Sequence, residues 1–421
     1  MKQIKHFITG FIQRSGSHIF IATLISKLFS FIGSWIALMI LPDKELGLAI
    51  FAFNIISFLI PLGGLGVQQS LLRYGSFLPT CNEKLNLYNI TIKKGVKWSV
   101  YLIILTIIFS PIITYKLKDS IIYLILLSVS ILSYFLFEIS KIKFRITYNN
   151  KMFALMDITF SSIQILNILI LSYYFGVYGY VFAIVLSPLV TFLIFKSKDY
   201  NYSSSEIPPI NFINKDFWMY GFFAGLANVA TQLLFAIDII LIGYLLIDPQ
   251  LVTHYKYVGI IPFSLLILPN ILITTDFVSI TENVDNPIFI KNYIKNFTLL
   301  FSFISIFIFG GVFFFGKYIL RIFGENYTVY YHLFMILTIG VIGVFILRSL
   351  FGNLLSAIGK AHLNFWIACV SLISNIILNY YFIPIYGILG AGMTSAIIMW
   401  FSGILSMLLF LFYYKRYLKG F

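Results

Sequence analysis

Charged side chains inside long apolar segments are the residues of this chain that could do chemistry. Lys27 lies about nine residues into an apolar segment over 18–41, or roughly 14 Å along a helix that rises 1.5 Å per residue. A charge at that depth in a bilayer is unfavourable by a few kcal/mol or more, so it usually faces a cavity or a charged partner. We therefore expect Lys27 to face a polar cavity.

Other charged residues of the apolar segments are open to two interpretations. Lys256 lies near an expected outer helix end, from which its ammonium group could also reach the membrane surface. Asp238 could pair with Lys256, or it could couple to a proton or Na⁺. Asp157, Arg73 and Arg348 fall near expected cytoplasmic helix ends, where they could bind a ligand or ion or anchor the helices at the interface.

Uncharged polar residues recur at helical spacing within the same segments. Thr23, Lys27 and Ser30 are four and three residues apart, which places them on one face of a helix. The other uncharged polar residues that we expect to line a cavity are Asn54, Gln68, Gln164, Asn228, Gln232 and Asn375. Hydrogen bonding between neighbouring helices, worth about 0.5–2 kcal/mol each, is the alternative for every one of them.

The elements that carry these residues are expected to be membrane-spanning helices. The chain has 421 residues, of which 60% are hydrophobic and 10% charged, and its mean hydropathy is +0.95. Continuously apolar runs of about twenty residues have the length of a spanning helix and lack the alternation of a barrel strand. We predict twelve such segments, near 18–41, 46–70, 97–115, 120–140, 152–174, 177–195, 217–247, 251–275, 297–316, 329–350, 363–383 and 387–412.

The second half of the chain repeats the first. The run YYFGVYG at Tyr173 recurs as YYFIPIYGILG at Tyr380, 207 residues later, and the glycines that follow are offset by 211. Six apolar segments precede the polar linker 196–216 and six follow it. We therefore predict an all-α integral membrane protein of two pseudo-symmetric six-helix lobes, 1–205 and 206–421, with a site between them.

A glycine cluster interrupts the apolar segment over 46–70. Gly63, Gly64 and Gly66 follow Pro61 and are expected to loosen or bend the helix. A hinge or gate is the functional interpretation of this cluster, and close helix packing is the structural one.

The net charge of +14 reflects orientation in the membrane. Most Lys and Arg residues fall on one expected side, so the positive-inside rule places both termini in the cytoplasm. Contact with anionic headgroups then explains the charge better than nucleic-acid binding does. Phosphate-binding loops, HExxH, CxxC and nucleophile-elbow motifs are absent from the sequence, so we expect no enzyme, no cofactor and no metal site.

Three segments resemble the multidrug/oligosaccharidyl-lipid/polysaccharide (MOP) exporter superfamily. They are LPDKELGLAIFAF (41–53), GLGVQQSLLRYGS (64–76) and the YG-x-x-G-type starts of the last segment in each half. Within the superfamily the chain most resembles the Wzx-type O-antigen flippases of bacterial inner membranes. That resemblance implies movement of an undecaprenyl-diphosphate-linked oligosaccharide to the periplasmic leaflet by alternating access, driven by an ion gradient or the membrane potential.

The resemblance also implies roles for residues and partners. Lys27 and Lys256 match the location of the family's cationic lumen residues, and Arg73 and Arg348 extend this substrate-binding set. Asp238, with Asp157, is implied in coupling to H⁺ or Na⁺. The run HYKYVG (254–259) departs from the family pattern around Lys256. Implied partners are membrane lipids, a polysaccharide polymerase and a chain-length regulator; the alternatives are a drug/cation antiporter, or a membrane polymerase or glycosyltransferase of the same pathway.

Overall fold

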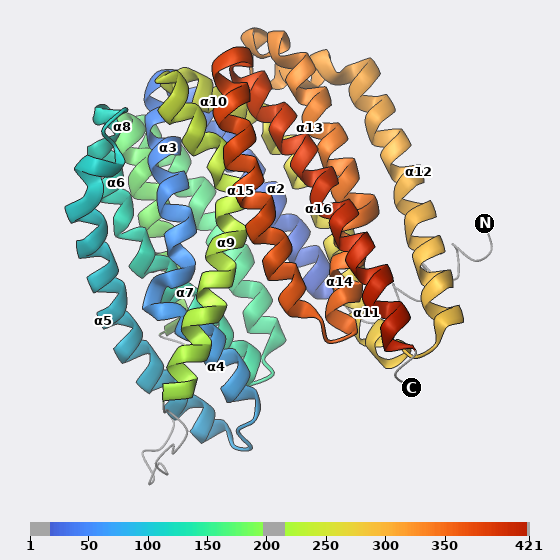
Figure 1. Cartoon of the computed structure of the whole chain (residues 1–421). Helices are drawn as coiled ribbons and strands as arrows, with labels where there is room; N and C mark the ends of the chain where they lie inside the picture. The colour runs from blue at the N-terminus through green and yellow to red at the C-terminus, as the bar shows by residue number, and fades with distance from the viewer. Residues whose placement is uncertain (1–16, 197–214, 419–421) are drawn as a thin grey trace. The chain divides into compact units, whose positions relative to one another are not determined.

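The computed structural model describes residues 17–196 and 215–418, and these residues form only helices and short connections (Figure 1). The apolar, repetitive sequence therefore folds as an all-helical membrane protein, as predicted. The first half of the chain forms α2 (Ser17–Ile40), α3 (Asp43–Leu59), η1 (Ile60–Gly66), α4 (Val67–Ser76), α5 (Cys81–Ile113), η2 (Lys118–Ser120), α6 (Ile121–Ser128), α7 (Ser130–Ile146) and α8 (Asn150–Lys196).

The second half continues the same pattern of long helices and short turns. It forms α9 (Lys215–Leu246), α10 (Pro249–Ser264), α11 (Ile267–Glu282), α12 (Pro287–Leu320), η3 (Arg321–Phe323), η4 (Glu325–Tyr330), α13 (Tyr331–Gly343), the π-helix η5 (Val344–Arg348), α14 (Ser349–Ala357), α15 (Ala361–Tyr386) and α16 (Ile388–Tyr417). Nine helices of the described residues are long and apolar enough to cross a membrane. The number of twelve spanning segments stays a prediction.

The described residues group into two compact units. The first, called here the N-terminal unit, contains Ile21–Thr253, and the second, the C-terminal unit, contains His254–Phe421 together with residues 17–20 at the start of α2. Helix α9 packs against α3, η1 and α4 and so belongs to the N-terminal unit. The lobe boundary between residues 205 and 206 stays a prediction.

One backbone turn occurs in both halves and explains the repeated glycines. Gly176 has φ 58° and ψ −137°, and Gly387 has φ 60° and ψ −141°. Three residues after each turn, a Cβ atom would lie 1.8 Å from a backbone carbonyl oxygen at Gly179 and 2.3 Å from one at Gly390. Because an L side chain is strained at the first position and sterically blocked at the second, both turns require their glycines.

The glycine cluster after Pro61 breaks a helix, as the sequence indicates. Gly64, Leu65 and Gly66 have φ values of 63°, 57° and 68°, which interrupt the helical path between α3 and α4. A second break was not predicted. The expected helix over 251–275 is two helices, α10 and α11, which are separated at residues 265–266 and together reach Glu282.

Many basic residues lie on helices where loops were expected. The segment predicted to begin near residue 97 begins at Cys81, so Lys84, Lys93 and Lys94 lie on α5. Thr80 and Glu83 form a capping box at the start of this helix, which explains why it begins so early. With 33 residues, α5 is about 50 Å long, well over the thickness of a hydrocarbon core.

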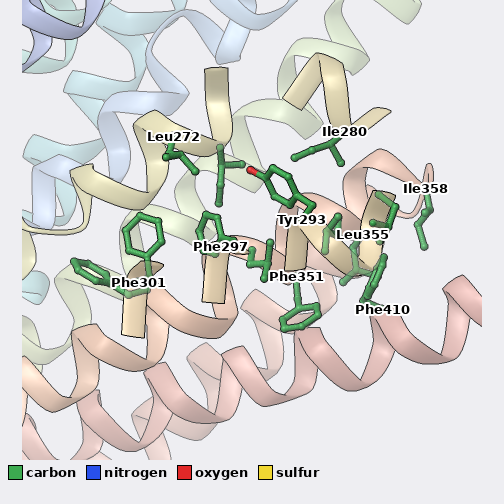
Figure 2. Close-up of a cluster of buried hydrophobic side chains, with 14 of the residues drawn as sticks. Leu272, Ile280, Tyr293, Phe297, Phe301, Phe351, Leu355, Ile358 and Phe410 are labelled. Atoms are coloured by element: carbon green, nitrogen blue, oxygen red, sulfur yellow. The ribbon is translucent and has the colours of Figure 1, made fainter. Parts of the chain in front are cut away.

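The C-terminal unit has an aromatic core (Figure 2). Tyr293, Phe297 and Phe301 recur every four residues on α12, and the last two rings have their centroids 4.5 Å apart. Buried residues from α11, α14 and α16 complete this cluster, among them Leu272, Ile280, Phe351, Leu355, Ile358 and Phe410. The core fixes α12 against η5, where the ring centroids of Phe301 and Phe345 lie 5.6 Å apart, and thereby supports the polar residues described next.

Candidate functional site

A partly buried arginine marks the strongest candidate site of the C-terminal unit. Arg348 is the last residue of the π-helix η5, between α13 and α14. Short π-helical insertions are rare in proteins, and many of those that do occur lie at functional sites. From the end of this insertion the side chain of Arg348 reaches α15 and α16.

Neutral groups hold the guanidinium group of Arg348. Its Nη1 donates to Asn364 Oδ1 at 2.9 Å and to Ser406 Oγ at 2.8 Å. Asn364 is oriented in turn, because its Nδ2 donates to Gly352 O at 2.7 Å and to Ser356 Oγ at 3.1 Å. Among the described residues no carboxylate forms an ion pair with Arg348. The positive charge is therefore fixed in position and not neutralised.

A comparable cation of the N-terminal unit is neutralised. Lys141 Nζ lies 2.8 Å from Asp157 Oδ1 and 3.5 Å from Glu138 Oε1. The ammonium group also lies 5.2 Å and 5.1 Å from the ring centroids of Phe137 and Phe153. The side chains of Lys141 and Asp157 are 13% and 26% exposed, so both partners are largely shielded from solvent. Asp157, predicted to couple to an ion, is thus engaged with a lysine.

The two cationic sites are related by the sequence repeat. Arg348 and Asn364 lie 207 residues after Lys141 and Asp157, the same offset that relates the two YYF runs, and each pair is separated by 16 residues. In the second copy an asparagine replaces the aspartate. The loop between the two residues of each pair contains a residue with positive φ, Tyr148 in the first half and Gly359 in the second, and these are 211 residues apart. Relative to its loop, the second pair is therefore displaced by four residues, about one turn of a helix.

The predicted hinge contacts the start of α9. A Cβ atom on Gly66 would lie 2.2 Å from Gly221 O and 3.0 Å from Gly225 Cα, so the two backbones touch. Ser70 Oγ donates to Phe217 O at 2.6 Å in the same contact. The helix break and α9 form one packed surface, and the role of Gly63, Gly64 and Gly66 as a hinge stays a prediction.

Arg73 extends this contact at its exposed edge. Its Cζ lies 4.5 Å from the ring centroid of Tyr220 and 5.8 Å from that of Tyr74. Lys94 lies 5.5 Å from the ring of Trp218 nearby on α9. The two cations therefore stack on aromatic faces, which leaves Arg73 available to an anionic group at the surface.

Two predicted cavity residues lie next to the helix break. Gln68 is 7% exposed, and its Nε2 donates to Pro61 O at 3.2 Å while its Oε1 accepts no hydrogen bond. Asn54 is 6% exposed and donates to Ile50 O at 2.8 Å. The side chain of Asn54 therefore bonds to the backbone of its own helix, whereas Gln68 retains a buried acceptor oxygen without a partner.

The remaining predicted residues are spread over both units. Asp238 on α9 and Asn375 on α15 are buried, and Asn375 accepts from Asn379 Nδ2 at 2.7 Å. Ser30 is exposed and donates to Ser26 O. Lys256 and Gln164 are partly buried, and Asn228 and Gln232 are exposed. The side chains of Thr23 and Lys27 lie outside the described part of the chain, so the deep lysine of the sequence stays a prediction, as does the pairing of Asp238 with Lys256.

Sequence reasoning missed one buried carboxylate. Asp276 on α11 is 4% exposed, and Tyr293 OH donates to its Oδ2 at 3.3 Å. The predicted segment ended near residue 275, one residue before this aspartate. The absence of a Gly or Pro after residue 275 was the signal that the helix continues.

Comparison with known proteins identifies the fold. No protein-family model and no curated protein matches the sequence. Among solved structures, the lipid II flippase MurJ in an inward closed conformation is similar at 21% identity and a TM-score of 0.72, covering 94% of this chain and 87% of that one. A multidrug resistance MATE family transporter of the MOP superfamily, inward-facing, is similar at 13% identity and a TM-score of 0.70, covering 94% and 96%. A MATE protein in the bent conformation covers 100% and 99% at 14% identity, with a TM-score of 0.62. The chain has the fold of these proteins.

Proposed function

We propose that this protein is a flippase that moves an anionic, lipid-linked oligosaccharide between the leaflets of a membrane. The partly buried cation at Arg348, held by neutral partners, carries the proposal, because a flippase of this kind must draw a diphosphate headgroup into an apolar bundle. The similarity of fold to a lipid flippase and to exporters supports a transporter rather than an enzyme.

The charge of the Arg348 site favours an anionic ligand. Arg348 has two neutral partners, whereas Lys141 has two carboxylates. At an effective dielectric of 20, a phosphate oxygen about 4 Å from a guanidinium group gains about 4 kcal/mol. A ligand phosphate could therefore supply the neutralising charge that the chain supplies to Lys141.

The finer parts of the proposal come from the sequence. The substrate is an undecaprenyl-diphosphate-linked, O-antigen-type repeat unit, and the protein lies in the bacterial inner membrane with both termini in the cytoplasm. Lys27, Lys256 and Arg73 assist Arg348 in binding the diphosphate. Asp238 couples transport to H⁺ or Na⁺, and the two six-helix lobes alternate in access to the two sides.

Flipping in proteoliposomes tests this proposal. A fluorescent polyprenyl-diphosphate oligosaccharide is placed in one leaflet, and its exposure to an enzyme on the opposite side is followed over time. Arg348→Gln should reduce the flipping rate by about tenfold or more, equivalent to about 1.4 kcal/mol, and Arg348→Lys should retain part of it. Arg321→Gln is the control, because Arg321 is exposed and paired with Glu325. Wild-type flipping in Arg348→Gln would refute the role of this cation.

A drug/cation antiporter is the second candidate, and the MATE-like fold is the observation that favours it. Such a protein needs an acidic site for its cation. Asp157 is already paired with Lys141, whereas Asp238 and Asp276 are buried carboxylates that could serve. Gradient-driven export of a cationic dye, without movement of the diphosphate lipid, would replace the flippase proposal with this one.

A further inference from the structure

A groove lies along the surface of the C-terminal unit between α12 and the α13–η5 segment. Its volume is about 580 Å³. Helix α12 contributes Ser302, Ser305, Phe309 and Gly310, while Ile342 and Ile346 form the opposite wall. Only 22% of the most apolar window of the span Pro287–Phe323 is buried within the protein, so this helix faces the lipid. The groove is therefore open to the hydrocarbon core of the bilayer.

One polar atom in this groove has no partner. Ser305 is 4% exposed, and its hydroxyl group makes no hydrogen bond. Ser356, Ser402 and Ser406 of the same unit each donate to a carbonyl group three or four residues earlier, whereas Ser371 on α15 shares the unpaired state of Ser305. An unpaired hydroxyl group in an apolar setting is unfavourable. Its position indicates an occupant that can accept a weak hydrogen bond.

The shape of the groove excludes a close helix partner. Transmembrane helices pack closely where small residues let their backbones approach. Beside Gly310 stand Phe307 and Phe314, which are 65% and 73% exposed and keep another helix at a distance. A thin flexible chain can pass between these rings and reach the floor of the groove at Gly310, where a Cβ atom would meet nothing within 4 Å.

We propose that this groove holds the isoprenoid chain of the lipid-linked substrate, an inference that rests on the proposed function. Each isoprene unit has a carbon–carbon double bond, and π electrons accept weak hydrogen bonds from donors such as Ser305. A saturated acyl chain offers no acceptor. The aromatic lining from Phe309 also suits an unsaturated, branched chain.

Side chains of η5 contribute to both the groove and the Arg348 site, but they point in different directions. Ile346 faces the groove beside α12, whereas Arg348 reaches Asn364 and Ser406 on α15 and α16. The two sites can therefore be altered separately. A chain bound on the bilayer side would keep the lipid attached to the protein while its headgroup changes leaflet.

Photo-crosslinking of the full-length protein in nanodiscs tests the groove. A photoreactive amino acid replaces Ile306, which lines the groove and is 69% exposed. The probes are radiolabelled neutral polyprenol and a labelled saturated phospholipid at equal mole fractions. We expect polyprenol adducts to exceed phospholipid adducts by about tenfold, equivalent to about 1.4 kcal/mol.

Neighbouring glycines provide a variant and its matched control. Gly310→Leu should fill the groove and lower polyprenol labelling about tenfold, a change of about 1.4 kcal/mol. Gly311→Leu should leave labelling unchanged, since Gly311 does not line the groove, although its Cβ position is equally open. Ser305→Ala, which keeps the volume, should lower labelling about threefold, in keeping with a weak hydrogen bond to a π system.

The outcomes separate this inference from the proposed function. Neutral polyprenol carries no diphosphate, so Arg348→Gln should retain wild-type labelling even though flipping falls. Equal labelling by the phospholipid, a crosslink to a second copy of the chain, or unchanged labelling in Gly310→Leu would each overturn the isoprenoid site. Absence of flipping by the wild type, with polyprenol labelling intact, would instead overturn the flippase proposal.

Discussion

Replacing Asn364 with aspartate should weaken anion binding at Arg348 without altering Arg348 itself. In the native protein Asn364 Oδ1 accepts from Arg348 Nη1 at 2.9 Å. The Asn364→Asp variant places a carboxylate at that distance and recreates in the second half the pairing that Lys141 has with Asp157 in the first. The guanidinium group would then be neutralised by the protein itself.

The size of the effect follows from these contacts. Two unit charges about 3 Å apart attract by about 6 kcal/mol at an effective dielectric of 20. Desolvation of the new carboxylate opposes this gain. The variant also loses the donor that Asn364 Nδ2 directs to Gly352 O at 2.7 Å, and an unsatisfied buried group costs about 1–3 kcal/mol. We expect stability to change by no more than about 2 kcal/mol, whereas affinity for an anionic ligand falls.

Binding and unfolding measured on the same protein check this expectation. The affinity of a short-chain polyprenyl diphosphate, measured by calorimetry in detergent, should fall about 10–100-fold, equivalent to about 1.4–2.8 kcal/mol. Asn364→Ser is the control, because it shortens the side chain without adding charge. Wild-type affinity in a folded Asn364→Asp protein would show that the Arg348 charge does not bind the ligand. A similar loss in Asn364→Ser would point to geometry rather than charge.

Two further predictions concern stability, measured by thermal or denaturant unfolding in detergent. Asp157→Asn should lower the free energy of unfolding by about 1–3 kcal/mol, since Lys141 would keep only the longer contact to Glu138 in a partly exposed site; unchanged unfolding would mean that this ion pair is worth little. Gly176→Ala and Gly387→Ala should each cost about 1–2 kcal/mol, because both residues have positive φ with open space around them. Gly179→Ala should lower the free energy of unfolding by more than either of these variants, because its Cβ would lie 1.8 Å from a carbonyl oxygen. Equal losses in the three variants would refute the steric argument.

The fold could be predicted because membrane burial and backbone conformation leave marks in the sequence. Continuous apolar runs exclude soluble domains, and a glycine followed by another three residues later indicates the turns at Gly176 and Gly387. The break between α10 and α11 is indicated only by Pro262 and Pro269, which flank it at three residues on either side, and not by hydropathy. Leu265 and Leu266 stand at that break and are as apolar as the helices on either side, so hydropathy runs through it without interruption.

The sequence predicts which charged residue belongs to the candidate site but not which residues surround it. The sequence identifies Arg348 as an unusual charge, but its partners lie 16 and 58 residues away and depend on how α14, α15 and α16 pack. Single polar residues of a helix also satisfy their own backbone, as Asn54 does, and spacing does not distinguish this from a cavity position. Asp276 was lost to a boundary misplaced by a few residues, the least certain part of any such prediction.

The contact between Gly66 and the start of α9 has a consequence for rates. The backbones touch at Gly66, and Phe217 of α9 is buried in one hydrophobic cluster with Val67 and Leu71 of α4, so separating them would expose this cluster and break the polar contacts beside it. The Ser70–Phe217 hydrogen bond and the stacking of Arg73 on Tyr220 are each worth about 0.5–1.5 kcal/mol. Since about 1.4 kcal/mol is tenfold in rate, a single substitution at Ser70 or Arg73 should change the rate of the proposed hinge motion by up to about an order of magnitude. The rate of the proposed motion would thereby be adjustable at Ser70, which is buried beside the helix break, without any change at Arg348.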